Sequence, residues 1–231
     1  MSLPLYIGHP SCPEAFRIVP GRIPDGGTVC VSVPPVTPAR EDVFVMLLRL
    51  LRDRPETELA LNDWGTLYRC AEMKRRGELT ASLTAGVLLA GQDTDPLLAA
   101  FLRPRPDKTV YDADGQPVRL RWAPPPDTLV KHWRTPSVFA CVPMLEELGV
   151  SRLELCAQPL PFPEEAPGLP VTLYRRAIVS VFPCGGDCGR CAGGPVRRGG
   201  APLLREKNLL LADFPADLPP WIDRVTDDFV I

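Results

Sequence analysis

The sequence predicts an α/β fold built on a parallel sheet. Over the first hundred residues, short runs of β-branched and apolar residues alternate with stretches whose apolar residues repeat at helical spacing. This strand–helix–strand order implies parallel strands joined by right-handed crossovers. The 29 prolines divide the chain into short elements. The chain has 231 residues, of which 45% are hydrophobic, so it can bury one core, and we expect a single domain over residues 1–231.

The first half of the chain supplies four of the expected strands and three helices. The strands are expected at residues 3–7, 28–33, 58–61 and 79–84. A helix that opens at Pro38 carries a wide apolar stripe, which includes Val43 and Leu47. A second helix begins after Asp63, a favourable N-cap residue, and ends at Gly77. A short third helix is expected over residues 93–102.

The second half begins with an interruption of this rhythm. Residues 104–126 are rich in proline and charge and contain an Asp114-Gly115 turn. They indicate an irregular insertion or a small hairpin rather than a second domain. Beyond it we expect a helix over 136–148, a strand at 152–156, and a long strand or bent pair of strands over 171–182. A glycine- and cysteine-rich loop at 184–200 follows, and then strands at 208–212 and 224–230.

The charge balance excludes some classes of partner. The formal net charge is −2, from 26 basic and 28 acidic residues, whereas a nucleic-acid-binding protein usually presents a strongly basic face. No apolar run approaches the ~20 residues that cross a bilayer. The first nine residues lack a basic segment followed by a long apolar one, so we expect no secretory signal and a cytoplasmic protein.

Three closely spaced cysteines predict a metal centre. Cys184, Cys188 and Cys191 form a C-x3-C-x2-C pattern on a glycine-rich segment. In a reducing compartment, clustered cysteines indicate metal binding rather than disulfides. A fourth ligand is expected from Cys12 or Cys156, because each follows or ends a predicted strand and such strand ends share one face in a parallel barrel. Spacing alone permits either zinc or an iron–sulfur cluster.

Several short motifs resemble the UbiU/UbiV-like group of the collagenase-like peptidase superfamily. Residues 61–65 (LNDWG), with the helix and strand that follow them, are similar to one segment of that group. Residues 148–155 (LGVSRLEL) resemble its LGV-x-R-x-E-x strand entry, and residues 223–225 (DRV) resemble a late strand. Residues 6–8 (YIG), followed by Cys12, resemble its early strand and the cysteine after it. The resemblance covers most of the chain through short motifs.

This resemblance implies a fold, a cofactor and a reaction class. Members of the group are TIM-type (β/α) barrels. Here the barrel is expected to be incomplete or shortened, since the usual first strand and helix are missing, and to be closed by a related partner chain. The group holds a 4Fe–4S cluster with one early and three later cysteines, which Cys12, Cys188 and Cys191 match by position and Cys184 approximately. The resemblance therefore favours Cys12 as the fourth ligand and leaves Cys156 in reserve. It implies oxygen-independent hydroxylation of an aromatic or nucleobase substrate; some relatives act on transfer or ribosomal RNA.

Other polar residues are candidates for the site. His9, Asp63 and Glu154 are candidate catalytic residues. Each also has a structural alternative: His9 as a loop histidine, Asp63 as a helix N-cap, and Glu154 in an inward salt bridge with Arg175. Arg175 and Arg176 are candidates for binding an anionic substrate or offsetting the cluster charge, with solvated charge as the alternative.

Two functions of different classes follow. The first is an enzyme, or one subunit of an enzyme, that uses a 4Fe–4S cluster. The second is a non-catalytic subunit that binds an iron–sulfur cluster or zinc and docks on a larger partner. Proteolysis is not expected, because the sequence has neither a Ser-His-Asp order nor an H-E-x-x-H zinc motif.

Overall fold

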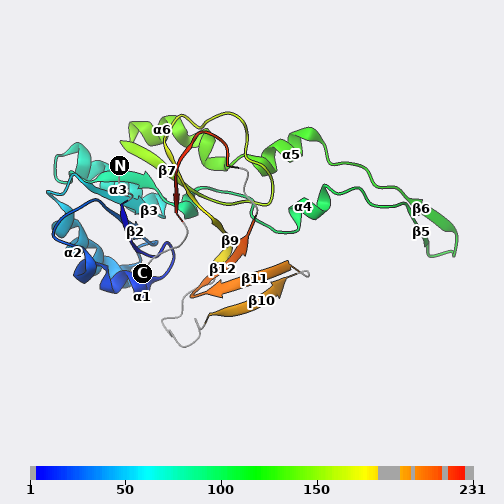
Figure 1. The fold of residues 1–231 in the computed structure, drawn as a ribbon, viewed down its shortest axis with the longest axis horizontal. Helices are drawn as coiled ribbons and strands as arrows, with labels where there is room; N and C mark the ends of the chain where they lie inside the picture. The colour runs from blue at the N-terminus through cyan, green and yellow to red at the C-terminus, as the bar shows by residue number, and fades with distance from the viewer. Residues whose placement is uncertain (1–3, 182–192, 199–200, 215–217, 227–231) are drawn as a thin grey trace.

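The structure is a computed structural model and describes residues 4–181, 193–198, 201–214 and 218–226. Its centre is a parallel seven-stranded sheet with the order β1-β2-β3-β4-β7-β8-β13 (Figure 1). These strands are β1 (Leu5–Gly8), β2 (Val29–Val33), β3 (Thr57–Leu61), β4 (Ser82–Ala85), β7 (Val150–Cys156), β8 (Val171–Tyr174) and β13 (Ile222–Thr226). The sheet curls, so that Arg224 on one edge strand lies 3.3 Å from the Tyr6 hydroxyl on the other. The predicted α/β class is confirmed, and the curled sheet is consistent with a partial barrel.

Helices cover the outer face of this sheet. The α-helices are α1 (Pro13–Ile18), α2 (Glu41–Leu51), α3 (Trp64–Arg75), α4 (Leu98–Phe101), α5 (Asp127–Arg134) and α6 (Val142–Glu147). Four 3₁₀ turns accompany them: η1 (Val19–Arg22), η2 (Pro38–Arg40), η3 (Val87–Leu89) and η4 (Ser137–Cys141). The largest core cluster joins α2 and α3 to the sheet through fully buried side chains such as Leu47, Leu67, Val31, Leu59 and Leu173. This packing explains the apolar stripe on α2, because the stripe faces the sheet.

A second, antiparallel sheet covers part of the inner face. It has the order β10-β11-β12-β9, with β9 (Arg176–Val181), β10 (Gly194–Arg198), β11 (Ala201–Glu206) and β12 (Leu209–Asp213). A second core cluster joins Leu209 and Leu211 of β12 to Tyr6 and Tyr174 of the parallel sheet. The bent pair of strands predicted over 171–182 is confirmed as β8 and β9. The loop predicted over 184–200 is wrong at its end, because residues 194–198 pair with β11.

The predicted insertion is a hairpin that extends away from the body (Figure 1). β5 (Lys108–Tyr111) and β6 (Pro117–Leu120) form a separate antiparallel pair within the segment 104–126. The helix predicted over 93–102 is shorter, and only α4 is α-helical. The helix predicted over 136–148 divides into η4 and α6. The sequence pattern did not predict α5, which buries no residue, or β11.

One glycine fixes the path of the chain from β1 towards Cys12. Gly8 has a φ of +100°, and a Cβ at this position would lie 2.4 Å from the carbonyl oxygen of Ser32. Only glycine fits this conformation and this contact. Within the described part of the chain, no helix is long and apolar enough to cross a membrane.

Candidate functional site

Cys12 lies in the loop after β1, at the carboxyl edge of the parallel sheet. It is the N-cap residue of α1, and its Sγ accepts a hydrogen bond from the Ala15 amide at 3.4 Å. The side chain is buried, with 5% of its surface exposed. Cys184, Cys188 and Cys191, the other three predicted ligands, lie outside the described residues. Among the described residues, no group of three or more histidine, cysteine or acidic side chains could hold a metal ion.

The strands that flank the cysteine segment are anchored near Cys12. Val181, the last described residue before the segment, pairs with Leu209, and Gly194 after it pairs with Arg205. Leu209 and Arg205 flank the β11–β12 turn, which contains Asn208. Asn208 contacts the loop of Cys12: its Nδ2 donates to the Ser11 carbonyl at 2.9 Å, and its Oδ1 accepts from the Ser11 hydroxyl at 2.9 Å. Both described ends of the segment therefore lie at the turn that contacts the residue before Cys12.

His9 organises the same loop. Its Nδ1 accepts hydrogen bonds from the amides of Ser11 at 3.3 Å and Cys12 at 3.1 Å. The imidazole is fully buried, and this burial, together with the positive charge of Lys207, lowers the pKa of His9 to about 3. The ring is therefore neutral near pH 7, with its proton on Nε2. These contacts make His9 a positioning residue for Cys12.

Cys156, the reserve ligand, lies at the carboxyl end of β7 in the second core cluster. Burial raises the pKa of its thiol to about 12. Its backbone is held by Gln92, whose Oε1 accepts from the Cys156 amide at 2.8 Å and whose Nε2 donates to the Cys156 carbonyl at 2.6 Å. A thiol in this environment is protonated and packed, which suits a core residue better than a thiolate ligand.

Glu154 points into the curled sheet, as the sequence predicted for an inward carboxyl group. Its Oε1 accepts a hydrogen bond from the Tyr174 hydroxyl at 3.0 Å, and the Cys30 Sγ lies 3.8 Å from the same oxygen. Burial is the main cause that raises the pKa of Glu154 to about 7; the charge of Glu58 acts in the same direction, and the hydrogen bonds from Tyr174 and the Val87 backbone and the charge of Arg224 act against it. Arg175, which the sequence suggested as a salt-bridge partner of Glu154, is exposed.

Two arginine–carboxylate pairs accompany Glu154 on the inner face. Arg224 holds Glu58 through two hydrogen bonds of 2.8 and 2.9 Å. Arg152 holds Asp223 through two hydrogen bonds of 2.8 Å. The Arg224 guanidinium also contacts the Tyr6 hydroxyl, whose pKa burial raises to about 12. The pairing of Glu58 with Arg224 was not predicted from the sequence; the available signal was the one charged residue of β3 and the charged residues of β13.

The remaining predicted residues lie elsewhere. Asp63 is the N-cap of α3: its carboxylate accepts from the Thr66 amide at 2.8 Å and from the Thr66 hydroxyl. The Arg175 amide donates to the Thr226 carbonyl at 3.0 Å, which ties β8 to β13. Arg176 lies on β9 and forms ion pairs with Glu206 at 3.8 Å and Asp213 at 3.5 Å. The structure does not bring Asp63 or Arg176 into contact with Glu154.

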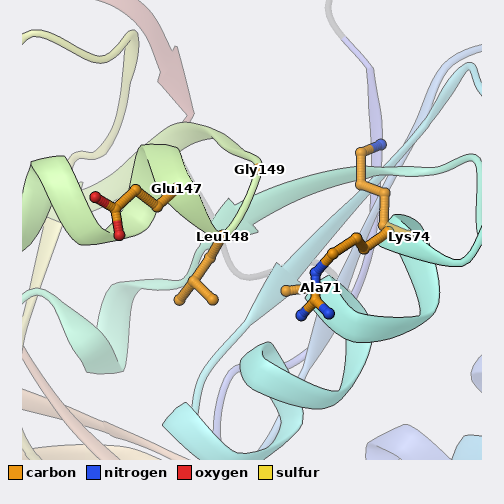
Figure 2. Close-up of a pocket in the computed structure, with 6 residues that line it drawn as sticks. Ala71, Lys74, Glu147, Leu148 and Gly149 are labelled. Atoms are coloured by element: carbon orange, nitrogen blue, oxygen red, sulfur yellow. The ribbon is translucent and has the colours of Figure 1, made fainter.

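A surface pocket lies between α3 and the turn from α6 to β7 (Figure 2). Ala71, Leu148 and Gly149 line it together with charged side chains. The amino group of Lys74 donates to the Ala81 carbonyl at 2.8 Å, so it stabilises the backbone just before β4. The pocket adjoins the start of β7, so it lies at the edge of the sheet opposite Cys12 and does not belong to the predicted site.

Comparisons with known protein families, with curated proteins and with solved structures found no match.

Proposed function

We propose that the protein binds one 4Fe–4S cluster through Cys12, Cys184, Cys188 and Cys191. One observation carries the proposal: both strands that flank the cysteine segment are anchored at the turn that contacts the Cys12 loop. The described residues on either side of the C-x3-C-x2-C segment therefore lie close to the proposed fourth ligand. The two parts of the ligand set are 172 residues apart in sequence, and this topology supports their meeting.

The environment of Cys12 fits a cluster ligand. An amide N–H bonded to sulfur stabilises a thiolate and tunes an iron–sulfur cluster, and the Ala15 amide supplies such a bond to Sγ. His9 holds the Cys12 backbone amide through Nδ1, which fixes the position of the ligand. When bound, a cluster of this kind supplies one-electron redox chemistry.

The proposed function is that of an enzyme or enzyme subunit in oxygen-independent hydroxylation of an aromatic or nucleobase substrate. This follows from the UbiU/UbiV-like resemblance, which also implies a shortened TIM-type barrel. Glu154 supports it, because a carboxyl group with a pKa of about 7 can exchange a proton near neutral pH. A related partner chain that pairs with β1 or β13, the two edge strands, would complete the barrel.

A second function is favoured by a different observation. Arg152 and Arg224 on the inner face are each bound by a carboxylate of the same chain. An inner face whose cations are already paired suits a non-catalytic subunit, in which an iron–sulfur cluster or zinc has a structural or electron-transfer role.

Anaerobic purification with iron, sulfide and zinc analysis tests the ligand set. We expect four irons for each chain, broad visible absorption and bleaching by dithionite. Cys12→Ser should lower the iron content as much as Cys188→Ser does. Cys141→Ser is the matched control, because Cys141 lies on η4, away from β1, and should keep full iron. Stoichiometric zinc without iron would reject the cluster, and iron lost from Cys156→Ser but kept in Cys12→Ser would reject Cys12 as the ligand.

A further inference from the structure

The β5–β6 hairpin forms an arm whose two faces differ. By register and strand alternation, Lys108, Val110, Val118 and Leu120 share one face. Three of these four side chains are apolar, and Leu120 is 51% exposed. Within the described part of the chain, this apolar sheet face is therefore exposed to solvent and no other element covers it.

The opposite face of the hairpin holds charged side chains together with Tyr111 and Pro117, and Tyr111 is 73% exposed. Asp107 forms ion pairs there with Arg119 at 2.8 Å and with Arg121 at 3.9 Å. Thr109 lies on this face, opposite Arg119. The two faces therefore differ in charge: among the paired residues of the apolar face, Lys108 is the one charged side chain. An isolated two-stranded hairpin is marginally stable in water, which gives the arm a physical reason to bind.

A second uncovered apolar surface lies along α2. Pro38, Val45 and Met46 line a groove there, and Met46 is 47% exposed. Glu41 and Asp42 form the acidic part of its lining and Arg49 the basic part; the Glu41 carboxylate is ion-paired with Arg69, so Asp42 supplies the carboxylate for a basic ligand. The groove combines apolar contact area with carboxylates, which suits a ligand with an apolar face and basic residues.

The two surfaces are complementary in charge. Residues 103–121 contain five basic and three acidic residues, although the whole chain has an acidic balance. Lys108 lies on the apolar face of the hairpin and can meet the carboxylate of Asp42 at the rim of the groove. The hairpin and α2 lie at opposite ends of the molecule, so they cannot meet within one chain (Figure 1).

We propose that the apolar face of the hairpin binds the α2 groove of a second copy of the chain. Two copies related by a two-fold axis, with their long axes antiparallel, place each hairpin on the other copy's groove. The contact is then made twice, and the assembly closes as a dimer. The ion pairs of Asp107 with Arg119 and Arg121 favour a protein over a nucleic acid, because they neutralise part of the arm's positive charge.

Light scattering and sedimentation velocity on the full-length protein test this assembly. We expect a dimer for the wild type. Leu120→Asp on the hairpin and Met46→Asp in the groove should each weaken dimerisation by roughly tenfold or more, because each variant places a carboxylate in both symmetric contacts. Thr109→Asp is the matched control: it puts the same charge on the opposite face of the same hairpin and should leave the dimer intact.

Mixing the two weakened variants provides the decisive test. The Leu120→Asp chain keeps an intact groove and the Met46→Asp chain keeps an intact hairpin, so an equimolar mixture regains one of the two contacts. Heterodimers should form in the mixture at concentrations where each variant alone is monomeric. A wild type that is monomeric at about 100 µM, where a stable dimer would be populated, overturns the proposal. So does a dimer that survives either substitution, or a mixture that stays monomeric; binding to RNA or to another protein instead would reassign the hairpin. Circular dichroism checks that each variant is folded.

Discussion

The two faces of the parallel sheet are built from the same strands but follow different rules. On the helix-covered face, alternate residues such as Leu59, Leu83 and Leu153 are fully buried among other apolar side chains. On the inner face, the intervening residues include Glu58, Glu154 and Tyr174. Apolar packing tolerates conservative exchange, whereas each inner-face charge depends on one partner with a defined geometry. The apolar packing of the helix-covered face therefore stabilises the fold, and the charge pairs of the inner face specify its shape.

The inner face also has an unequal number of cations and carboxyl groups. Glu58 and Asp223 are each held by an arginine through two hydrogen bonds. Glu154 has no such arginine and accepts from the neutral hydroxyl of Tyr174. A buried carboxyl group without a cation favours its protonated form. The lack of an arginine partner and the raised pKa therefore both indicate that Glu154 is readily protonated in the folded protein.

The largest effect is expected on the helix-covered face. Leu59→Ala removes a fully buried side chain from the centre of the core and should lower the free energy of unfolding by about 4 kcal/mol, from lost burial and the cavity left behind. Equilibrium urea unfolding measures this loss. Leu59→Met, which keeps the volume, should cost less than about 1.5 kcal/mol. Equal losses for the two variants would show that this face is not closely packed.

A somewhat smaller loss is expected when one inner-face partner is removed. Arg224→Met leaves the largely buried Glu58 with only the Arg152 Nε at 4.0 Å, and should cost about 3 kcal/mol. Adding Glu58→Leu should recover part of this loss, because the unpaired carboxylate is then gone. A double mutant cycle by urea unfolding measures the coupling. A double variant less stable than Arg224→Met alone would contradict this account of the pair.

The contrast between the faces also explains what the sequence could predict. The strands at 28–33, 58–61 and 152–156 were predicted close to their observed bounds, because apolar alternation is a local signal. Glu154 was predicted to point inward for the same reason. The contacts around Glu154 were not predicted. Tyr6 and Arg224, for example, are separated by 218 positions and meet only because the sheet curls.

The elements that were missed include α1, α5 and β11. Helix α5 buries no residue. Helix α1 buries Phe16 but has six residues, which are too few for a helical apolar period to be recognised. The ligand set is a different case. Cys12 lies in the loop after β1, while the other three proposed ligands lie outside the described residues. The 4Fe–4S cluster therefore stays a prediction, and the iron analysis described above is its test.

The smallest of the three effects depends on pH. The pKa of Glu154 is about 7 in the folded protein against an ordinary value of 4.5, so the folded state holds this proton more tightly than the unfolded state. Its contribution to stability is complete below pH 4.5 and is lost as the pH rises through 7. His9 acts in the opposite direction: its pKa is lowered to about 3, so stability is lost as the pH falls below 6.5.

Glu154→Gln separates these two contributions. Glutamine keeps an oxygen that can accept from the Tyr174 hydroxyl and cannot ionise, so only the Glu154 contribution disappears. Between pH 5 and pH 8, the stability of the variant relative to wild type should rise by between about 2 and 3 kcal/mol, because a shift of one pKa unit corresponds to about 1.4 kcal/mol. Urea unfolding across this range measures the difference, and His9 cancels because both proteins contain it. A difference that does not change with pH would show that Glu154 is ionised in the folded protein and has a cation partner.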